Sequence, residues 1–154
     1  MKLSANLTLK EATKSNTAIK NGIHNIPGDR DLAALQNIAK KVFQPVRNHF
    51  NYPIKVTSGY RSSELNKKIG GSNTSQHCKG EALDMDADYF GGMTNCEIFN
   101  YIKNKLDFDQ LIWEFGTDAE PDWVHVSLKY KGIQRKEVLK ASRRNGKTIY
   151  ERIL

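Results

Sequence analysis

The order of hydrophobic patterns along the chain is the feature that most limits its fold. Between residues 31 and 50, apolar side chains recur every three or four positions, which predicts an amphipathic helix. Beyond residue 110, two segments rich in apolar and aromatic residues, 111–115 and 123–128, flank a polar loop, which predicts two strands. Helices early and strands late, in only 154 residues, favour a single α+β domain whose small antiparallel sheet is flanked by helices.

Local signals place the individual elements. Thr8 and Thr94 are each followed three residues later by Glu, so both are expected to begin a helix with a capping box, the second running to about Leu106. Pro45 is expected to kink or end the helix that follows Asp31. The segment from about Ile133 is expected to be partly helical. Strands are expected at four places, of which the last two form a hairpin: 54–58, 82–86, 111–115 and 123–128.

Charge is distributed unevenly between a core at about residues 7–130 and an extension at 131–154. Residues 1–128 contain fifteen Lys/Arg and fifteen Asp/Glu, whereas the last 26 residues contain nine Lys/Arg and two Glu, so the net charge of +7 comes from the end of the chain. A basic segment attracts polyanions, such as anionic cell-envelope polymers, phospholipid or nucleic acid. A solvated surface with no partner is the alternative interpretation of the same charges.

Several protein classes do not fit the sequence. No apolar stretch approaches the roughly 20 residues that span a bilayer, so no membrane span is expected. The first residues lack the apolar region of a secretory signal, which leads us to expect synthesis in the cytoplasm. Two cysteines do not make a disulfide framework, and both are expected to be reduced.

Three side chains stand out as candidate metal ligands. His77 and Asp84 lie seven residues apart, and His125 lies in the strand expected at 123–128. Catalytic zinc typically takes three His or carboxylate ligands and keeps a fourth position for water. Arg61 follows an expected strand, where its guanidinium can bind a carboxylate or stabilise an oxyanion. Spacing alone leaves structural roles open for both histidines.

Three sequence motifs occur in order along the chain: Ser-Gly-Tyr-Arg at 58–61, Ser-x-His-x6-Asp at 75–84, and Trp-x-His at 123–125. Together they resemble the motifs of the zinc D-alanyl-D-alanine carboxypeptidase family. This family includes bacterial carboxypeptidases, D-Ala-D-Ala dipeptidases and phage endolysins. Residues 7–12 and 22–27 are similar to the compact phage branch, and the resemblance covers roughly residues 7–130.

The resemblance implies metal-assisted hydrolysis of peptide bonds. It implies a Zn²⁺ ion held by His77, Asp84 and His125, in a cleft on the sheet. Arg61 would then stabilise the oxyanion or hold the carboxylate of the substrate. Three further residues are expected to line the substrate site, although the first two have turn roles as an equal alternative: Ser75, Gln76 and Trp123.

The general base has two main candidates. Asp122 lies three residues before His125, the offset at which the family commonly places its catalytic carboxylate, and Pro121 favours a loop there. Glu114 lies on the preceding strand, and the alternation of a regular strand favours it, because residues three apart point to opposite faces. We favour Asp122, with Glu114 as the alternative and Glu120 behind both.

The sequence therefore predicts an enzyme that acts on bacterial peptidoglycan. The lack of an export signal favours a lytic endopeptidase of the phage type, which reaches the wall after release. A carboxypeptidase that trims terminal D-Ala is the second possibility. A catalytically inactive wall-binding module and a nucleic-acid-binding protein are further alternatives, and the intact ligand set argues against the inactive module.

Overall fold

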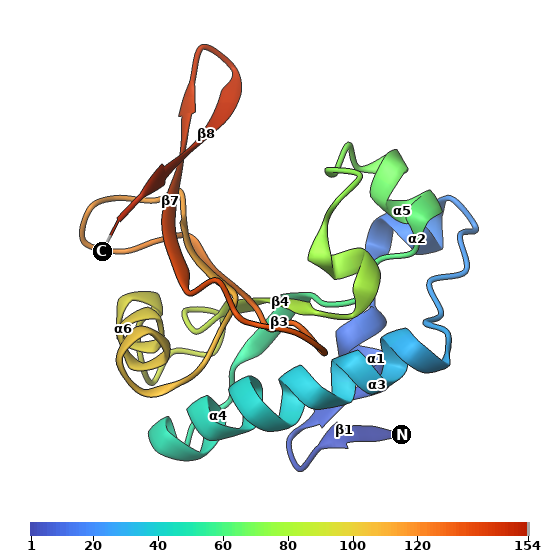
Figure 1. Ribbon diagram of the computed structural model, residues 1–154, viewed down its shortest axis with the longest axis horizontal. Helices are drawn as coiled ribbons and strands as arrows, with labels where there is room; N and C mark the ends of the chain where they lie inside the picture. The colour runs from blue at the N-terminus through green and yellow to red at the C-terminus, as the bar shows by residue number, and fades with distance from the viewer. Residues whose placement is uncertain (154) are drawn as a thin grey trace.

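The computed structural model describes residues 1–153 and places most helices before most strands (Figure 1). None of the helices in this range is both long enough and apolar enough to cross a bilayer. The helical segments are α1 (Leu9–Thr13), α2 (Asn16–Lys20), α3 (Asp29–Ile38), the π-helix η1 (Ala39–Phe43), α4 (Gln44–Phe50), α5 (Ser63–Lys68), the 3-10 helix η2 (Gln76–Lys79) and α6 (Asn95–Lys105).

A six-stranded sheet forms the centre of the molecule, beside a short β1–β2 ladder. Its order is β3-β4-β6-β5-β7-β8, and every neighbouring pair is antiparallel except β5 and β7, which are parallel. The α+β class, with helices flanking one sheet, is confirmed, and so is the β5–β6 hairpin. The strands are β1 (Lys2–Ser4), β2 (Leu7–Thr8), β3 (Lys55–Ser58), β4 (Ala82–Asp86), β5 (Gln110–Glu114), β6 (Trp123–Ser127), β7 (Glu137–Arg144) and β8 (Lys147–Arg152).

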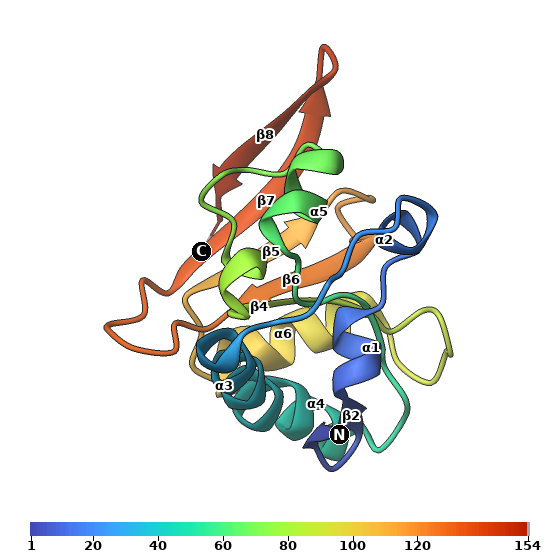
Figure 2. The same ribbon diagram turned by 90° about the vertical axis from the view of Figure 1, so that its right-hand side faces the viewer.

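Strand alternation gives the sheet two different faces. Leu83 on β4, Trp113 on β5 and Val124 on β6 belong to one buried cluster together with apolar residues of α3, η1, α4 and α6. Figure 2 shows these helices gathered on that side of the sheet. Residues at the intervening positions point to the opposite face, which the helices leave uncovered. That second face is where the polar motif residues lie.

The long helix passes Pro45 without ending. A π-helical turn, η1, joins α3 to α4, and the backbone N–H of Gln44 donates to the carbonyl of Ala39, five residues earlier. Pro45 therefore stands in the first turn of α4, where its missing N–H costs little. The sequence correctly indicated that Pro45 disturbs the helix, but the π-helical turn accommodates the proline and the helix continues.

The two predicted N-caps are present. The Thr8 hydroxyl accepts from the N–H of Glu11 at 3.2 Å, and the Glu11 carboxylate accepts from the N–H of Thr8 at 2.8 Å, which completes the capping box. Thr94 accepts from the N–H of Glu97 at 3.1 Å without the reciprocal bond. Both helices thus begin where the sequence indicated.

The expectation of a partly helical segment after Ile133 is wrong. This segment forms β7 and β8, an antiparallel hairpin that joins the main sheet through β5. Its turn is Asn145-Gly146, with φ values of 52° and 76°. Two consecutive positive φ values at Asn-Gly are typical of a type I′ turn, the usual two-residue connection of a hairpin. That dipeptide was the sequence signal for a hairpin.

Candidate metal centre

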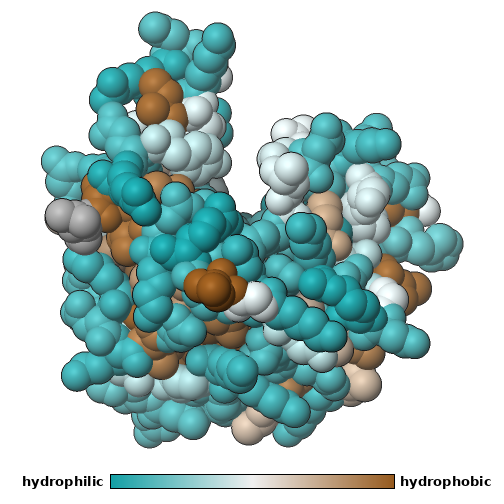
Figure 3. Space-filling model, in the orientation of Figure 1, coloured by the Kyte–Doolittle hydropathy of each residue, from teal (hydrophilic) through white to brown (hydrophobic). Residues whose placement is uncertain are grey.

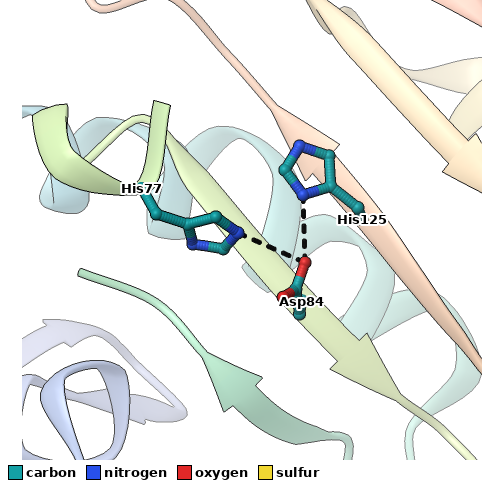
Figure 4. Close-up of side chains that lie close together, drawn as sticks. All are labelled: His77, Asp84 and His125. Atoms are coloured by element: carbon teal, nitrogen blue, oxygen red, sulfur yellow. Dashed lines mark hydrogen bonds and ion pairs between the residues drawn. The ribbon is translucent and has the colours of Figure 1, made fainter. Parts of the chain in front are cut away.

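Three side chains from different parts of the chain meet on the uncovered face of the sheet (Figure 4). Asp84 on β4 and His125 on β6 are direct cross-strand partners, so their side chains leave the same face side by side. The Asp84 Oδ1 atom lies 3.0 Å from His125 Nδ1 and 3.3 Å from His77 Nε2. The carboxylate oxygen thus lies between the two imidazole rings.

A tight turn brings His77 to the sheet. Ser75 caps η2 by accepting from the N–H of His77, and Gly80 ends it with φ 69°. A Cβ at Gly80 would lie 2.2 Å from the carbonyl oxygen of Asp31, so only glycine fits this approach to α3. The turn thereby sets His77 close enough to β4 to reach Asp84.

A backbone carbonyl fixes the tautomer of His77. The buried imidazole places Nδ1 2.6 Å from the carbonyl oxygen of Gly59. Because a carbonyl can only accept, Nδ1 carries a hydrogen, and Nε2 is the ring nitrogen that faces Asp84 and can bind a metal ion. A hydrogen bond from the other ring nitrogen to a backbone carbonyl is a common device for orienting a metal-binding histidine.

The geometry of the three groups fits a tetrahedral metal ion. Ligand bonds of about 2.0 Å in a tetrahedron put neighbouring donor atoms about 3.3 Å apart. The two Asp84 separations of 3.0 and 3.3 Å are close to that value, and all three donor atoms lie within 4.8 Å of one another. His77, Asp84 and His125 can therefore hold a metal ion.

Asp84 is ionised in this setting. Burial opposes the charged form, but the charges of His77 and His125 and their hydrogen bonds outweigh it and hold the pKa of Asp84 well below its usual range. An anionic carboxylate is the form that binds a cation. Neutral pH thus leaves the carboxylate ready to bind a metal ion.

The segment that carries Arg61 is held from two sides. A Cβ at Gly59 would lie 2.2 Å from the carbonyl oxygen of Ala12, so α1 approaches the backbone as closely as glycine permits. The Asn25 amide donates to the carbonyl of Tyr60 at 2.9 Å and accepts from the N–H of Ser62 at 2.7 Å. Asn25 thus clamps the residues on either side of Arg61.

The Arg61 guanidinium has spare hydrogen-bonding capacity. Its Nη2 atom donates to the Ser75 hydroxyl at 3.3 Å, while its buried Nε has no partner among the described residues. A buried donor without a partner is costly, and a ligand acceptor would relieve that cost. Arg61 is thus placed to bind an oxygen of a ligand.

A large cavity opens above the metal-binding trio. Its volume is about 1000 Å³, and His125, Glu114, Arg61, Ser75 and Gln76 all contribute to its wall. Figure 3 shows a hollow between the upright β7–β8 hairpin and the lobe of α2 and α5. Cations outnumber acids around it, six against two: Arg30, Arg61, Lys79, Lys129, Lys131 and Arg135 against Glu81 and Glu114.

Glu114 is the acidic group beside the trio. On β5, Ile112 is the residue opposite His125. Glu114 lies two positions further along the same face of the strand, so its Cα atom is roughly 7 Å from that of Ile112. Only 8% of Glu114 is exposed. Burial, aided by the charge of Asp84 and opposed by that of His125, raises the pKa of Glu114 to about 7. A carboxyl group with this pKa can accept and release a proton near neutral pH.

Asp122 and Trp123 lie outside the cavity. Asp122 is exposed, and the Asn95 amide donates to its backbone carbonyl at 3.1 Å. Asp122 lines a separate depression with Trp123, whose ring centroid is 5.4 Å from that of Phe115. The geometry therefore favours Glu114 over Asp122 as a group that acts beside the trio.

Sequence reasoning missed three residues that shape the site. Asn25 clamps the Arg61 segment, Arg135 lines the cavity, and so does Tyr150. Arg135 and Tyr150 lie beyond the resembling region, and nothing local marks them. Only the pairing of β7 with β5 and β8 brings them to the cavity.

The fold and the trio define a class, a peptidase-like α+β domain with a two-histidine, one-carboxylate metal centre. The chain matches the family model described as Peptidase M15 over residues 5–127. The chain belongs to this family, which confirms the resemblance found in the sequence. The family and the metal-binding trio indicate a zinc peptidase. No curated protein sequence matches the chain.

Proposed function

We propose that this protein is a zinc endopeptidase that hydrolyses peptide bonds in bacterial peptidoglycan. One observation carries the proposal: His125 of the trio, the buried Glu114 carboxyl group and Arg61, whose Nε has no partner among the described residues, line one cavity. These are the groups that metal-assisted hydrolysis of a peptide needs. Membership in the M15 family points to peptidoglycan as the source of the peptide.

The residues at the site have separate roles in the proposed mechanism. His77, Asp84 and His125 would hold a zinc ion, which when bound polarises the scissile carbonyl and makes water more acidic. Glu114 takes a proton from the attacking water and delivers it to the nitrogen of the leaving amine. Arg61, with its free Nε, donates to a substrate oxygen and so orients the peptide.

The form of the cleft supports cleavage within a longer chain. The cavity runs between the β7–β8 hairpin and the α5 lobe, and Figure 3 shows it open to solvent. Its volume of about 1000 Å³ lies at the upper end of the range for small-ligand pockets. There is thus room for peptide on both sides of a scissile bond.

A carboxypeptidase is the second candidate, and Arg61 is the observation that favours it. The Arg61 guanidinium, whose Nε has no partner within residues 1–153, can bind the terminal carboxylate of a substrate as a bidentate pair. Blocking the substrate's C-terminus as an amide separates the two proposals. An endopeptidase still cuts the amidated peptide, whereas a carboxypeptidase that needs the carboxylate loses most of its kcat/KM.

Binding of anionic wall polymers by residues 131–154 stays a prediction. Six of the nine basic side chains from residue 129 onward form ion pairs, for example Lys136 with Asp107 at 3.0 Å. Exposed pairs are weak and leave the net charge in place. The cations free of such pairs within residues 1–153, such as Lys147, are therefore the best placed to contact a polymer.

Digestion of purified peptidoglycan tests the proposed function. Zinc-loaded protein is incubated with walls of several crosslink chemistries, and mass spectrometry identifies the new termini. We expect released peptides with new amino and carboxyl ends within crosslinks or stems. The His125→Ala variant serves as the control for contaminating hydrolases. Walls bound but left intact by the zinc-loaded protein would instead indicate an inactive binding module.

A further inference from the structure

The row of residues that contains Glu114 continues across the sheet onto the C-terminal hairpin. Glu114 on β5 is paired with Ala141 on β7, and Ala141 is paired with Tyr150 on β8. Residues paired across neighbouring strands share a face of the sheet. Tyr150 therefore lies on the face of the metal-binding trio, two strands from Glu114, or roughly 10 Å between Cα atoms.

A small residue separates the two larger ones. Ala141 is fully buried, and because its side chain is only a methyl group, it leaves room on this face of the sheet for the larger side chains of Glu114 and Tyr150. Tyr150 keeps 55% of its surface exposed and lines the same cavity as Glu114 and His125. The tyrosine ring thus forms part of the cavity wall and remains accessible to a ligand.

The Tyr150 hydroxyl lies within electrostatic range of the site. Burial, and then the negative charges of Glu114 and Asp84, raise the pKa of Tyr150. The phenol therefore stays protonated at neutral pH and acts as a hydrogen-bond donor. A donor that faces a peptide-sized cavity is suited to a carbonyl oxygen.

The hairpin is anchored firmly enough to serve as a wall. Asp109 is fully buried, and Arg135 donates to it from Nε at 3.0 Å and from Nη2 at 2.6 Å, just before β7 begins. The same Nη2 lies 3.4 Å from Gln76 Oε1, on the turn that carries His77. Arg135 thus ties the start of the hairpin to the opposite side of the cavity.

We propose that the β7–β8 hairpin is the second wall of the substrate cleft and that Tyr150 is a substrate-binding residue. Its hydroxyl donates a hydrogen bond to a carbonyl oxygen of the peptide that lies across the metal-binding trio. Both strands lie outside residues 5–127, the part that matches the family. The inference rests on the proposed function, and it implies that the hairpin contributes to substrate specificity.

Kinetics of the Tyr150→Phe variant test the inference, because this change removes only the hydroxyl. The substrate is the purified muropeptide that the wild-type enzyme cleaves fastest. One lost hydrogen bond corresponds to a KM about 3- to 10-fold higher, with kcat within twofold of wild type. Tyr89→Phe is the matched control, because Tyr89 is 63% exposed and lies outside the cavity wall. It should leave both constants unchanged.

A binding measurement separates contact with substrate from a structural effect. Calorimetry compares the zinc-loaded Glu114→Gln variant with Glu114→Gln/Tyr150→Phe, using the same muropeptide and equal zinc contents. We expect the double variant to bind about 3- to 10-fold more weakly. Tyr150→His, which keeps a donor, should recover part of the loss.

The two proposals fail in different ways. If the wild-type enzyme is active and Tyr150→Phe matches it in KM and in muropeptide affinity, the inference is overturned and the proposed function stands. If zinc-loaded wild-type protein cleaves no muropeptide and Glu114→Gln binds none, the proposed function is overturned, and this inference with it.

Discussion

Strands β4 to β6 and the hairpin β7–β8 belong to one sheet but expose their side chains differently. The alternate residues of β4, β5 and β6 lie in the core, and Asp84, His125 and Glu114 occupy the intervening positions. On β8, by contrast, five of the six residues are exposed. Central strands thus fix the spacing of groups that must meet, whereas an edge hairpin adds a surface that can change without disturbing that spacing.

The energetics of the two regions follow the same division. Each large core side chain of the central strands contributes about 1.5–3 kcal/mol through burial. The ion pairs along β8 are exposed, as in Arg144–Glu151 at 3.0 Å, and pairs of this kind contribute about 0–1 kcal/mol. We therefore expect large, uniform effects from changes at the centre and graded effects from changes at the hairpin.

The largest expected effect comes from the trio. His77→Ala, Asp84→Ala and His125→Ala should each lose zinc and all measurable peptide cleavage, because three protein ligands are the usual set for catalytic zinc. Elemental analysis and a muropeptide assay measure the two properties. His24→Ala, an exposed histidine, is the control and should keep both. Full activity in the presence of a strong chelator would contradict this prediction.

The next largest effect separates the two candidate bases. Glu114→Gln should keep zinc and lose about 10²- to 10⁴-fold in kcat, the usual contribution of a general base. Asp122→Asn is the matched control, because Asp122 is exposed outside the cavity, and it should stay within a few-fold of wild type. An inactive, zinc-loaded Asp122→Asn beside an active Glu114→Gln would reverse the assignment.

These two sites show what the sequence could and could not predict. The sequence motifs that resemble the family pointed to His77, Asp84 and His125, and the structure brings these three side chains together, while zinc binding by them stays a prediction. The choice between Glu114 and Asp122 depends on strand register and on the loop after β5, where Phe115 has φ 57°. Loop geometry of this kind arises from tertiary contacts, which local patterns do not contain.

The hairpin was less predictable than the centre for two different reasons. Asn145-Gly146 marks its turn, so the two strands could have been predicted from the residues of the turn. The proximity of Tyr150 to Glu114 was not, because it requires β7 to pair in parallel with β5 across more than twenty residues of intervening chain. Both helix N-caps, which depend only on neighbouring residues, were predicted correctly, although only the one at Thr8 is a complete capping box.

The pH dependence of kcat/KM should report Glu114. Burial raises its pKa from 4.5 to about 7, and a bound zinc ion acts in the opposite direction through its positive charge. A base must be ionised, so activity should fall about tenfold per pH unit below an acid limb between 4.5 and about 7. Zinc content measured at each pH excludes loss of metal as the cause. An acid limb above pH 7.5 would contradict the assignment.

Within the C-terminal region, two basic residues should differ in their effect on stability. Arg135→Gln leaves the buried Asp109 without its main partner and should lower the free energy of unfolding by about 2–4 kcal/mol. Lys136→Gln removes an exposed pair with Asp107 and should change it by less than about 0.5 kcal/mol. Urea unfolding of the metal-free proteins measures both. Equal effects of the two substitutions would mean that the pair with buried Asp109 contributes no more to stability than the exposed Lys136–Asp107 pair.

The smallest expected effect concerns cations that lie away from the cavity. Lys147 is exposed at the tip of the hairpin and forms no ion pair within residues 1–153, and Arg143 lies over the Phe115 ring at 5.0 Å. Changing both to Gln should weaken binding to anionic walls about 2- to 5-fold at low salt, and the difference should vanish near 0.5 M salt, where screening is strong. Cosedimentation with purified walls measures the binding, and cleavage of a small soluble peptide should stay unchanged. The matched control is Lys20→Gln/Lys41→Gln, which removes the same charge from exposed positions on α2 and η1, outside the hairpin. If both double variants lose wall binding equally, the attraction comes from net charge alone, and the hairpin has no special part in it.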